Sequence, residues 1–380
     1  MRVTKLFKDF FDSEKAGGLT LIVCTILSLF IANSTFGTDY HNFWQTKFQG
    51  LSIEHWVNDG LMTIFFLLIG LELEREIYIG ELSKLKDALL PIFGAIGGMF
   101  VPAGLFLMFN YGTQTQSGAG IPMATDIAFA LGILSLLGNR VPTSLKVFLT
   151  ALAVIDDLGA IIIIAIFYTK TLLWTNLFIA LGIFALLLVF NRMKVQNLIP
   201  YLIGGVAMWY FMLHSGVHAT ITGVLLAFAI PFGNGDEKST SYILQHFLHK
   251  PVAFIILPIF ALANTAIAFS GDIAQTLTEN NSLGIAVGLI VGKPLGIFLL
   301  TLLAVTFGLC KLPTDLNWKS IFGVGLLAGI GFTMSIFITL LAYDSETIIN
   351  KSKLVILISS LTAGVLGLIS LKLILKPTIN

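Results

Sequence analysis

The sequence predicts an all-α polytopic membrane protein with about twelve transmembrane helices, and its composition and apolar runs support this fold class. Of the 380 residues, 56% are hydrophobic and only 11% are charged, whereas soluble domains carry about 25% charged residues. The mean hydropathy is +0.91, and charged residues separate long apolar runs. This composition excludes an ordinary soluble enzyme, a disordered chain and a nucleic-acid-binding protein, which would carry an excess of basic residues.

Eight of the expected spans are uncharged apolar runs that approach the roughly 20 residues a spanning helix needs. These runs cover residues 16–32, 88–109, 171–190, 198–213, 216–230, 251–270, 320–343 and 354–371. Four further spans complete the count only if each accepts a charged residue inside it, and these cover residues 56–79, 118–137, 145–168 and 283–309. We expect one membrane domain over residues 1–380, with a short N-terminal segment 1–15 and a C-terminal tail 372–380 outside the membrane.

The basic residues predict the orientation, because short cytoplasmic loops are enriched in Lys and Arg. With both termini in the cytoplasm, 17 of the 22 Lys and Arg face the cytoplasm and one, Lys293, lies within a span. The four on the outer side are Lys47, Lys170, Lys351 and Lys353. This asymmetry requires an even number of spans. The longest outer loop, residues 33–55, mixes aromatic and polar residues and fits either a short hairpin or an interfacial segment.

Four charged residues are expected near the middle of the membrane: Asp126, Asp156, Asp157 and Lys293. Each lies far from the charged residues that mark the ends of its span, and each costs about 2.5–3.5 kcal/mol there on insertion scales. A helix-packing ion pair would explain Lys293 and one Asp, but one Lys cannot neutralise three carboxylates. Two adjacent carboxylates repel each other when both are ionised, so they favour binding a proton or a cation.

Two of the expected spans contain residues that interrupt helices. Gly and Pro residues precede Asp126 over residues 118–126, and four glycines crowd residues 323–331. Irregular backbone at membrane depth is tolerated where it is buried in protein or lines a cavity, and paired broken segments are typical of transporter sites built on inverted repeats. Asp126 would then neutralise the positive ends of the half-helices. Small-residue helix packing is the alternative for 323–331.

Several ionisable residues near the ends of the spans are weaker candidates. Glu72, Arg75 and Glu76 share one helix face by their spacing, so they fit either a cytoplasmic cation funnel and sensor or a solvated helix end. The others are His218, His246, His249 and Asp59. Histidine titrates near neutral pH, but a single interfacial His is more often a hydrogen-bonding residue. Asp59 fits a helix cap as well as it fits a functional group.

Two segments resemble motifs typical of enzymes but do not match them. Residues 288–294 resemble a P-loop, but the spacing is one residue short and Pro294 stands where the Ser or Thr that binds magnesium belongs. Residues 233–236 match the GxGD string of intramembrane aspartyl proteases but lie in a polar loop, and an aspartyl pair requires carboxyls from separate elements. We therefore expect a transporter and not an enzyme.

Seven motifs, taken in order along the chain, resemble the NhaA family of bacterial sodium/proton antiporters. They cover residues 58–59, 70–76, 124–130, 154–160, 216–220, 292–296 and 329–335. The resemblance implies exchange of Na⁺ or Li⁺ for H⁺ without a cofactor, in the bacterial cytoplasmic (inner) membrane. It also implies that spans 3–5 and 10–12 form inverted-topology repeats with two broken helices crossing at mid-membrane, and that the protein is a homodimer.

The resemblance also assigns roles to residues. Asp157 resembles the main ion- and proton-binding carboxylate, Asp156 its partner paired with Lys293, and Thr125 and Asp126 lie at the helix crossing. The residues implied in pH activation are Glu72, Arg75, Glu76, His246, His249 and His218. Glu74 and Gln245 depart from the family pattern, where Lys and Glu are common, which leaves pH activation open. A sodium-coupled organic-anion symporter of related fold is the alternative transporter, and a cation channel is the other rival.

Overall fold

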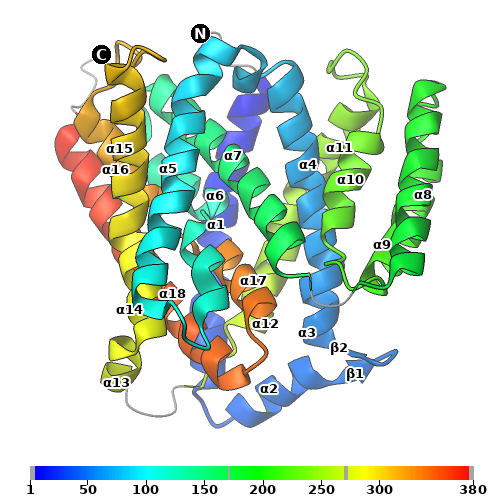
Figure 1. Cartoon of the computed structure of the whole chain (residues 1–380), viewed down its shortest axis with the longest axis horizontal. Coiled ribbons are helices and arrows are strands. Elements are labelled where there is room, and N and C mark those ends of the chain that lie inside the picture. Colours follow the sequence, from blue (N-terminus) through cyan, green and yellow to red (C-terminus); the bar gives the residue numbers. More distant parts are fainter. Residues whose placement is uncertain (1–4, 170–171, 269–272, 376–380) are drawn as a thin grey trace.

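Long apolar helices run side by side through the computed structural model, which describes residues 5–169, 172–268 and 273–375 (Figure 1). The first part of the chain forms α1 (Lys5–Ala32), α2 (Gly37–Gln45), β1 (Lys47–Phe48), β2 (Leu51–Ser52), α3 (Ile53–His55), η1 (Trp56–Leu61), α4 (Met62–Tyr78), η2 (Glu81–Ser83), α5 (Leu85–Asn110), η3 (Gln116–Met123), α6 (Ile127–Ser135), η4 (Gly138–Arg140), α7 (Thr143–Phe167), α8 (Trp174–Arg192), α9 (Leu198–Leu213) and α10 (Ile221–Ala229). Here η1 is a π-helical turn, and η2, η3 and η4 are 3₁₀ helices.

The second part continues with α11 (Thr240–Pro251), η5 (Val252–Ile256), α12 (Leu257–Asn264), α13 (Ile273–Thr278), α14 (Asn280–Val287), η6 (Gly288–Gly292), α15 (Lys293–Thr306), α16 (Trp318–Ala328), α17 (Phe332–Ala342) and α18 (Glu346–Ile374). Both η5 and η6 are π-helical turns inside longer helices. Parts of the predicted terminal segments, residues 1–4 and 376–380, lie outside the described residues.

The structure confirms the all-α membrane class but not the count of twelve spans. In the described part of the chain, eight helices are long and apolar enough to cross a membrane, or up to ten if each of two bent pairs forms one span. One bent pair is α16 and α17, at 49°; the other is residues 16–32 with α2, at 114°. The predicted spans at 198–213 and 216–230 are not among these helices, because α9 has only 16 residues and α10 only 9.

Two predicted boundaries are wrong by several residues. The span expected at 251–270 is a helix over Thr240–Asn264, because the chain passes through Pro251 by way of the π-helical turn η5 instead of starting there. The span expected at 354–371 begins at Glu346. Lys351 and Lys353 therefore lie on the helix α18 and not in a loop, and Lys353 is buried. A charged residue does not mark the end of a helix when it is paired inside the protein.

The segment expected as an outer loop, residues 33–55, contains the short hairpin that was one of the two alternatives. It forms the short helix α2 and a two-stranded hairpin in which Lys47 pairs with Ser52 and Phe48 with Leu51. The two residues of the turn, Gln49 and Gly50, have φ angles of 51° and 87°, which is typical of the tight turns that match strand twist. We call this end of the molecule the hairpin end; α1 begins and α18 ends at the opposite end (Figure 1).

We divide the helices by chain segment into two groups, named here for reference. The core group comprises residues 85–167 and 280–374, and the flanking group comprises residues 5–78 and 174–264. In the core group, Gly97 of α5 and Gly296 of α15 pack so closely that a Cβ on either would lie 2.0 Å from the other's carbonyl oxygen. Such small-residue contacts bring helices together in membranes. The groups meet where α1 packs on α6, α4 on α7 and α12 on α17, while α8 and α9 lie far from α15 and α16 (Figure 1).

Candidate ion-binding site

Two broken helices of the core group meet at their breaks. Helix η3 ends at Met123 and α6 begins at Ile127, while α16 ends at Ala328 and α17 begins at Phe332. The Asp126 backbone N–H donates to the Ile330 carbonyl at 2.6 Å. The Thr125 hydroxyl oxygen lies 3.0 Å from the carbonyl oxygen of Ala328. Each break therefore satisfies backbone groups that the other leaves open, as irregular backbone away from water requires.

Asp126 is buried between the starts of the two half-helices. Its Oδ1 accepts the backbone N–H of Phe129 at 3.0 Å, so the side chain caps α6. Its Oδ2 accepts the backbone N–H of Thr333 at 3.1 Å and the Thr333 hydroxyl at 2.5 Å. One carboxylate thus contacts the N-terminal turns of α6 and α17, where helix dipoles favour negative charge. Thr333 was not singled out from the sequence, although it lies in the glycine-rich motif at 329–335.

Asp156 and Lys293 form a fully buried ion pair. Asp156 lies on α7, and Lys293 begins α15 directly after the π-helical turn η6. The Nζ–Oδ2 distance is 2.5 Å, and both side chains are 0% exposed. Lys293 also donates to the carbonyl oxygen of Met123, and the Thr125 hydroxyl donates to Asp156 Oδ2 at 2.6 Å. The pair is therefore tied to the end of η3 as well as to α7 and α15.

Asp157 differs from its neighbour because its carboxylate is buried without a hydrogen-bond donor. It is 1% exposed, and neither oxygen has a hydrogen-bond partner among the residues that the structure describes. An ionised carboxylate in this position loses its water without compensation, at a cost of several kcal/mol. Asp157 is therefore suited to hold either a proton or a cation.

A small cavity lies beside Asp157. Its lining residues include Asp157, Asp126, Thr125 and Thr333, and the remaining lining residues are apolar: Phe65, Ile127, Ala128, Leu257 and Met334. About 10 Å³ is open to the centre of a water-sized particle, close to the minimum that holds one water molecule. Carboxylate, hydroxyl and carbonyl oxygens are the ligands that hard cations prefer. Two carboxyl-bearing and two hydroxyl-bearing residues thus line a space about the size of one water molecule.

The residues predicted at the inner end of the second span lie on α4, where Arg75 interacts electrostatically with Glu72 and Glu76, and two of them have further contacts. Glu76 accepts the backbone N–H of Glu81 at 2.9 Å and so holds the turn after α4. Arg75 lies over the ring of Tyr242 on α11, at 5.3 Å. His246 stacks on the same ring, with centroids 6.2 Å apart.

Tyr242, which was not predicted, thus joins Arg75 to His246. Glu72 is buried, and so is Glu74, whose Oε2 has no hydrogen-bond partner within the described residues. His249 is on the same helix as His246, one turn further along. The structure therefore brings α4 and α11 together at this end, with Tyr242 between them.

Two further candidates lie near the hairpin end. Asp59 is in the π-helical turn η1, and its Oδ2 lies 2.8 Å from Nε2 of His55. His218 lies in the turn before α10, where its Nε2 is 2.9 Å from the carbonyl oxygen of Tyr168. The Tyr168 hydroxyl donates to the Ser117 carbonyl at 2.7 Å, and burial raises the pKa of Tyr168 to about 12. Both candidates thus have contacts that a structural role would explain.

Known proteins similar to this chain share a single description. A family model described as Na⁺/H⁺ antiporter 1 matches residues 8–371. A Flavobacterium psychrophilum protein named Na(+)/H(+) antiporter NhaA is 75% identical over 379 residues, which cover 100% of this chain and 99% of the relative. Proteins of the same name from Cytophaga hutchinsonii and Dechloromonas aromatica are each 62% identical, covering 100% and 96% of this chain and 98% and 95% of their own length. The chain belongs to the Na⁺/H⁺ antiporter 1 family of membrane transporters.

Proposed function

We propose that this chain exchanges cytoplasmic Na⁺ or Li⁺ for external protons across the bacterial inner membrane, and that Asp157 is the carboxylate that binds either ion. The observation that carries this proposal is the burial of Asp157, without a hydrogen-bond donor among the described residues, beside a small cavity that Asp126, Thr125 and Thr333 also line. A proton or a cation would each neutralise this carboxylate, but both cannot occupy it together. Cation binding therefore releases a proton, and the affinity for sodium falls as the pH falls.

The neighbouring groups have different roles in this proposal. Thr125 and Thr333 supply hydroxyl oxygens near the ion, and Asp126 compensates the helix ends that meet at the crossing. The Asp156–Lys293 pair provides a second group that can exchange a proton when the pair opens. More than one proton for each sodium ion would make the exchange electrogenic. The transported ions are the only ligands that the proposal requires, and it includes no cofactor.

Alternating access would carry the ion across the membrane. The order of elements in the core group supports inverted repeats, because a long helix, a broken helix and a long helix occur twice: α5, η3–α6 and α7, then α14–α15, α16–α17 and α18. Counting α9 and α10 as short spans gives twelve, with both termini in the cytoplasm and the hairpin end outside. A single membrane domain over residues 1–380 and a homodimer joined through the hairpin are part of the proposal.

The proposal places pH regulation at the other end, where Arg75 and His246 meet on Tyr242. Glu72, Glu76 and His249 lie on the same two helices. Glu74 and Gln245 change the charge of this region. We therefore expect the exchange rate of this chain to depend on pH differently from that of relatives with Lys and Glu at these positions. His218 would report on pH from the hairpin end.

The test is sodium-driven proton release by the purified chain in lipid vesicles, followed with a pH-sensitive dye. We expect sodium or lithium to release protons, and Asp157→Asn to reduce the rate at least a hundredfold while the variant folds normally. Asp39→Asn is the matched control, because Asp39 is exposed on α2. Full activity of Asp157→Asn would overturn the assignment. Sodium uptake that requires an organic anion would identify the alternative symporter.

A further inference from the structure

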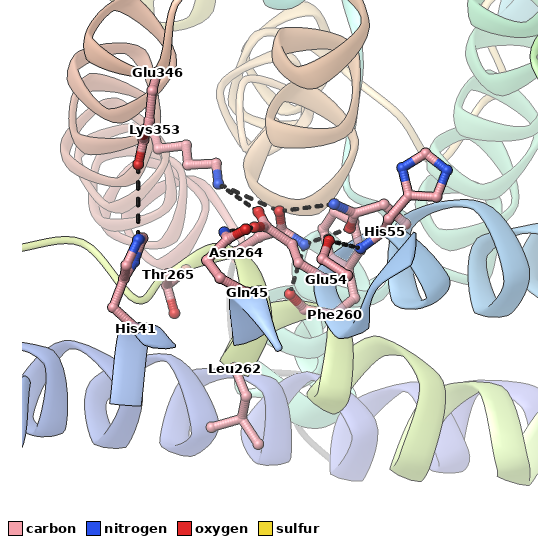
Figure 2. Close-up of polar contacts among 12 residues, drawn as sticks. His41, Gln45, Glu54, His55, Phe260, Leu262, Asn264, Thr265, Glu346 and Lys353 are labelled. Atoms are coloured by element: carbon pink, nitrogen blue, oxygen red, sulfur yellow. Dashed lines mark hydrogen bonds and ion pairs between the residues drawn. The ribbon is translucent and has the colours of Figure 1, made fainter. Parts of the chain in front are cut away.

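A second buried lysine lies away from the ion site, near the hairpin end. Lys353 is on α18 and is 4% exposed. Its Nζ lies 3.6 Å from Oε1 of Glu54 and donates to Oδ1 of Asn264 at 3.3 Å (Figure 2). Glu54 is on α3, and Asn264 is the last residue of α12. Lys353 belongs to the core group, and both of its partners belong to the flanking group.

Each partner is held in place by its own group. Asn264 donates to Oδ1 of Asn58 at 2.7 Å, and Glu54 accepts from Nε2 of Gln45 at 2.7 Å (Figure 2). Asn58 and Gln45 also belong to the flanking group. The flanking group therefore presents a prepared acceptor site into which the lysine of the core group reaches. Another contact between α18 and the flanking group, His41 with Glu346 at 3.8 Å, is exposed and contributes little for that reason.

An apolar contact between the same groups lies further from the hairpin end. Phe66 of α4 packs against Phe337 of α17 with ring centroids 5.4 Å apart, and both are 1% exposed. Phe65 and Met334, which lie on the same two helices, line the ion cavity. The groups are therefore in contact at two levels, at Lys353 near the hairpin end and at the two phenylalanines nearer the residues that line the cavity.

We propose that Lys353, with Glu54 and Asn264, is a clasp that holds the hairpin end closed, and that it must open before the ion site can face that side. This inference rests on the alternating access of the proposed function. The pair has a long, flexible lysine and a partly exposed carboxylate, 20% exposed at the side chain. When the groups separate, water can solvate both charges. The clasp therefore favours the state that is closed at the hairpin end without preventing the state that is open there.

A neighbouring ion pair provides the matched control. Lys351 lies two residues before Lys353 on α18 and pairs with Glu279 at 2.5 Å. Glu279 precedes α14, which packs on α18 inside the core group. Movement of the core group against the flanking group would leave this pair intact, so its removal should not change the balance between states.

The experiment uses the full chain in lipid vesicles with Cys24 and Cys310, its two cysteines, replaced by Ser. Leu341→Cys supplies a reporter, because Leu341 is one helical turn beyond Phe337 on the same face and is partly buried. A membrane-impermeant maleimide is applied from the hairpin side. We expect labelling about tenfold faster in Lys353→Met and Glu54→Gln, as a shift of about 1.4 kcal/mol between states gives, and no change in Lys351→Met.

The exchanged pair, Glu54→Lys with Lys353→Glu, should restore slow labelling, because it rebuilds the clasp with the charges reversed. Glu54→Gln keeps a side chain that can bond to Gln45, so it tests the clasp even if Lys353→Met folds poorly. Labelling no faster in Glu54→Gln than in Lys351→Met would overturn the clasp. Proton release is measured on the same vesicles. A parent chain that exchanges nothing overturns the proposed function, while the labelling comparison still decides the clasp.

Discussion

Lys293 and Lys353 are both buried lysines paired with carboxylates, but they connect different parts of the molecule. Lys293 and Asp156 both belong to the core group, and the Met123 carbonyl that Lys293 also contacts is in the same group. Lys353 belongs to the core group and reaches two residues of the flanking group, at the longer distances of 3.6 and 3.3 Å. A short, fully buried pair suits a site that keeps its shape, while a longer, partly hydrated pair suits a contact that opens.

The energetics of the two pairs should differ for the same reason. Removing one partner of a fully buried pair leaves a charge that nothing else compensates. Removing one partner of a pair that water can reach costs less, because solvent screens the remaining charge. The comparison of the two lysines can therefore be tested by measuring the free energy of unfolding of variants at each lysine, and how often the hairpin end opens in them.

The largest effect is expected for Lys293→Met. The substitution leaves Asp156 buried beside Asp157, and we expect it to lower the free energy of unfolding by about 3–5 kcal/mol and to lower the thermal midpoint. Acid pH should reduce the loss, because a bound proton replaces the missing positive charge. The thermal midpoint in detergent, measured over pH, checks this expectation.

Lys293→Met combined with Asp156→Asn is the control for that variant. The double variant removes both charges, so it should recover most of the lost stability. A single variant as stable as the parent at every pH would contradict a role of the Asp156–Lys293 pair in holding the site together.

The four mid-membrane charges show what the sequence predicts well. The structure buries Asp126, Asp156, Asp157 and Lys293 within one region, as their depth in the apolar runs indicated. Charges inside long apolar segments are costly and therefore informative. Their individual roles in ion binding stay predictions. Thr333 could not be found in this way, because a hydroxyl in an apolar run costs little and its partner Asp126 is more than two hundred residues earlier.

Lys353 shows why contacts between distant segments could not be predicted from the sequence. In the sequence it stands two residues after Lys351 at the edge of an apolar run, where basic residues commonly mark a loop. Its burial depends on Glu54 and Asn264, which come from distant segments, so no local pattern reveals it. The missed start of the helix at Thr240 has a similar cause, because the π-helical turn η5 accommodates Pro251 within a helix.

A smaller effect on stability is expected for Lys353→Met. Glu54 retains Gln45 as a donor and partial exposure to water, so the free energy of unfolding should fall by about 1–2 kcal/mol. This loss should be clearly smaller than that of Lys293→Met, even though the same variant speeds labelling from the hairpin side. Thermal midpoints of the two variants, measured side by side, decide the point. Equal losses would contradict the distinction between the two lysines.

The smallest effect near neutral pH is expected for Tyr168→Phe, which removes a hydrogen bond from the residue after α7 to η3 and leaves the contact with His218 intact. The variant loses the hydrogen bond to the Ser117 carbonyl, at a cost of about 1 kcal/mol, but keeps the backbone carbonyl that contacts His218.

Alkaline pH should reveal a second difference in Tyr168→Phe. Burial raises the pKa of Tyr168 from 10.0 to about 12, so the neutral phenol stabilises the fold at lower pH. Between about pH 10 and pH 12 the Tyr168 phenol ionises in the unfolded chain but stays neutral in the folded one. The free energy of unfolding therefore falls as the pH rises through this range. The parent should therefore lose stability over that range more steeply than Tyr168→Phe, as thermal midpoints will show. His218→Gln should retain the steep alkaline loss, because it leaves the phenol in place, and a parent whose midpoint falls no faster than that of Tyr168→Phe would contradict the burial of this hydroxyl.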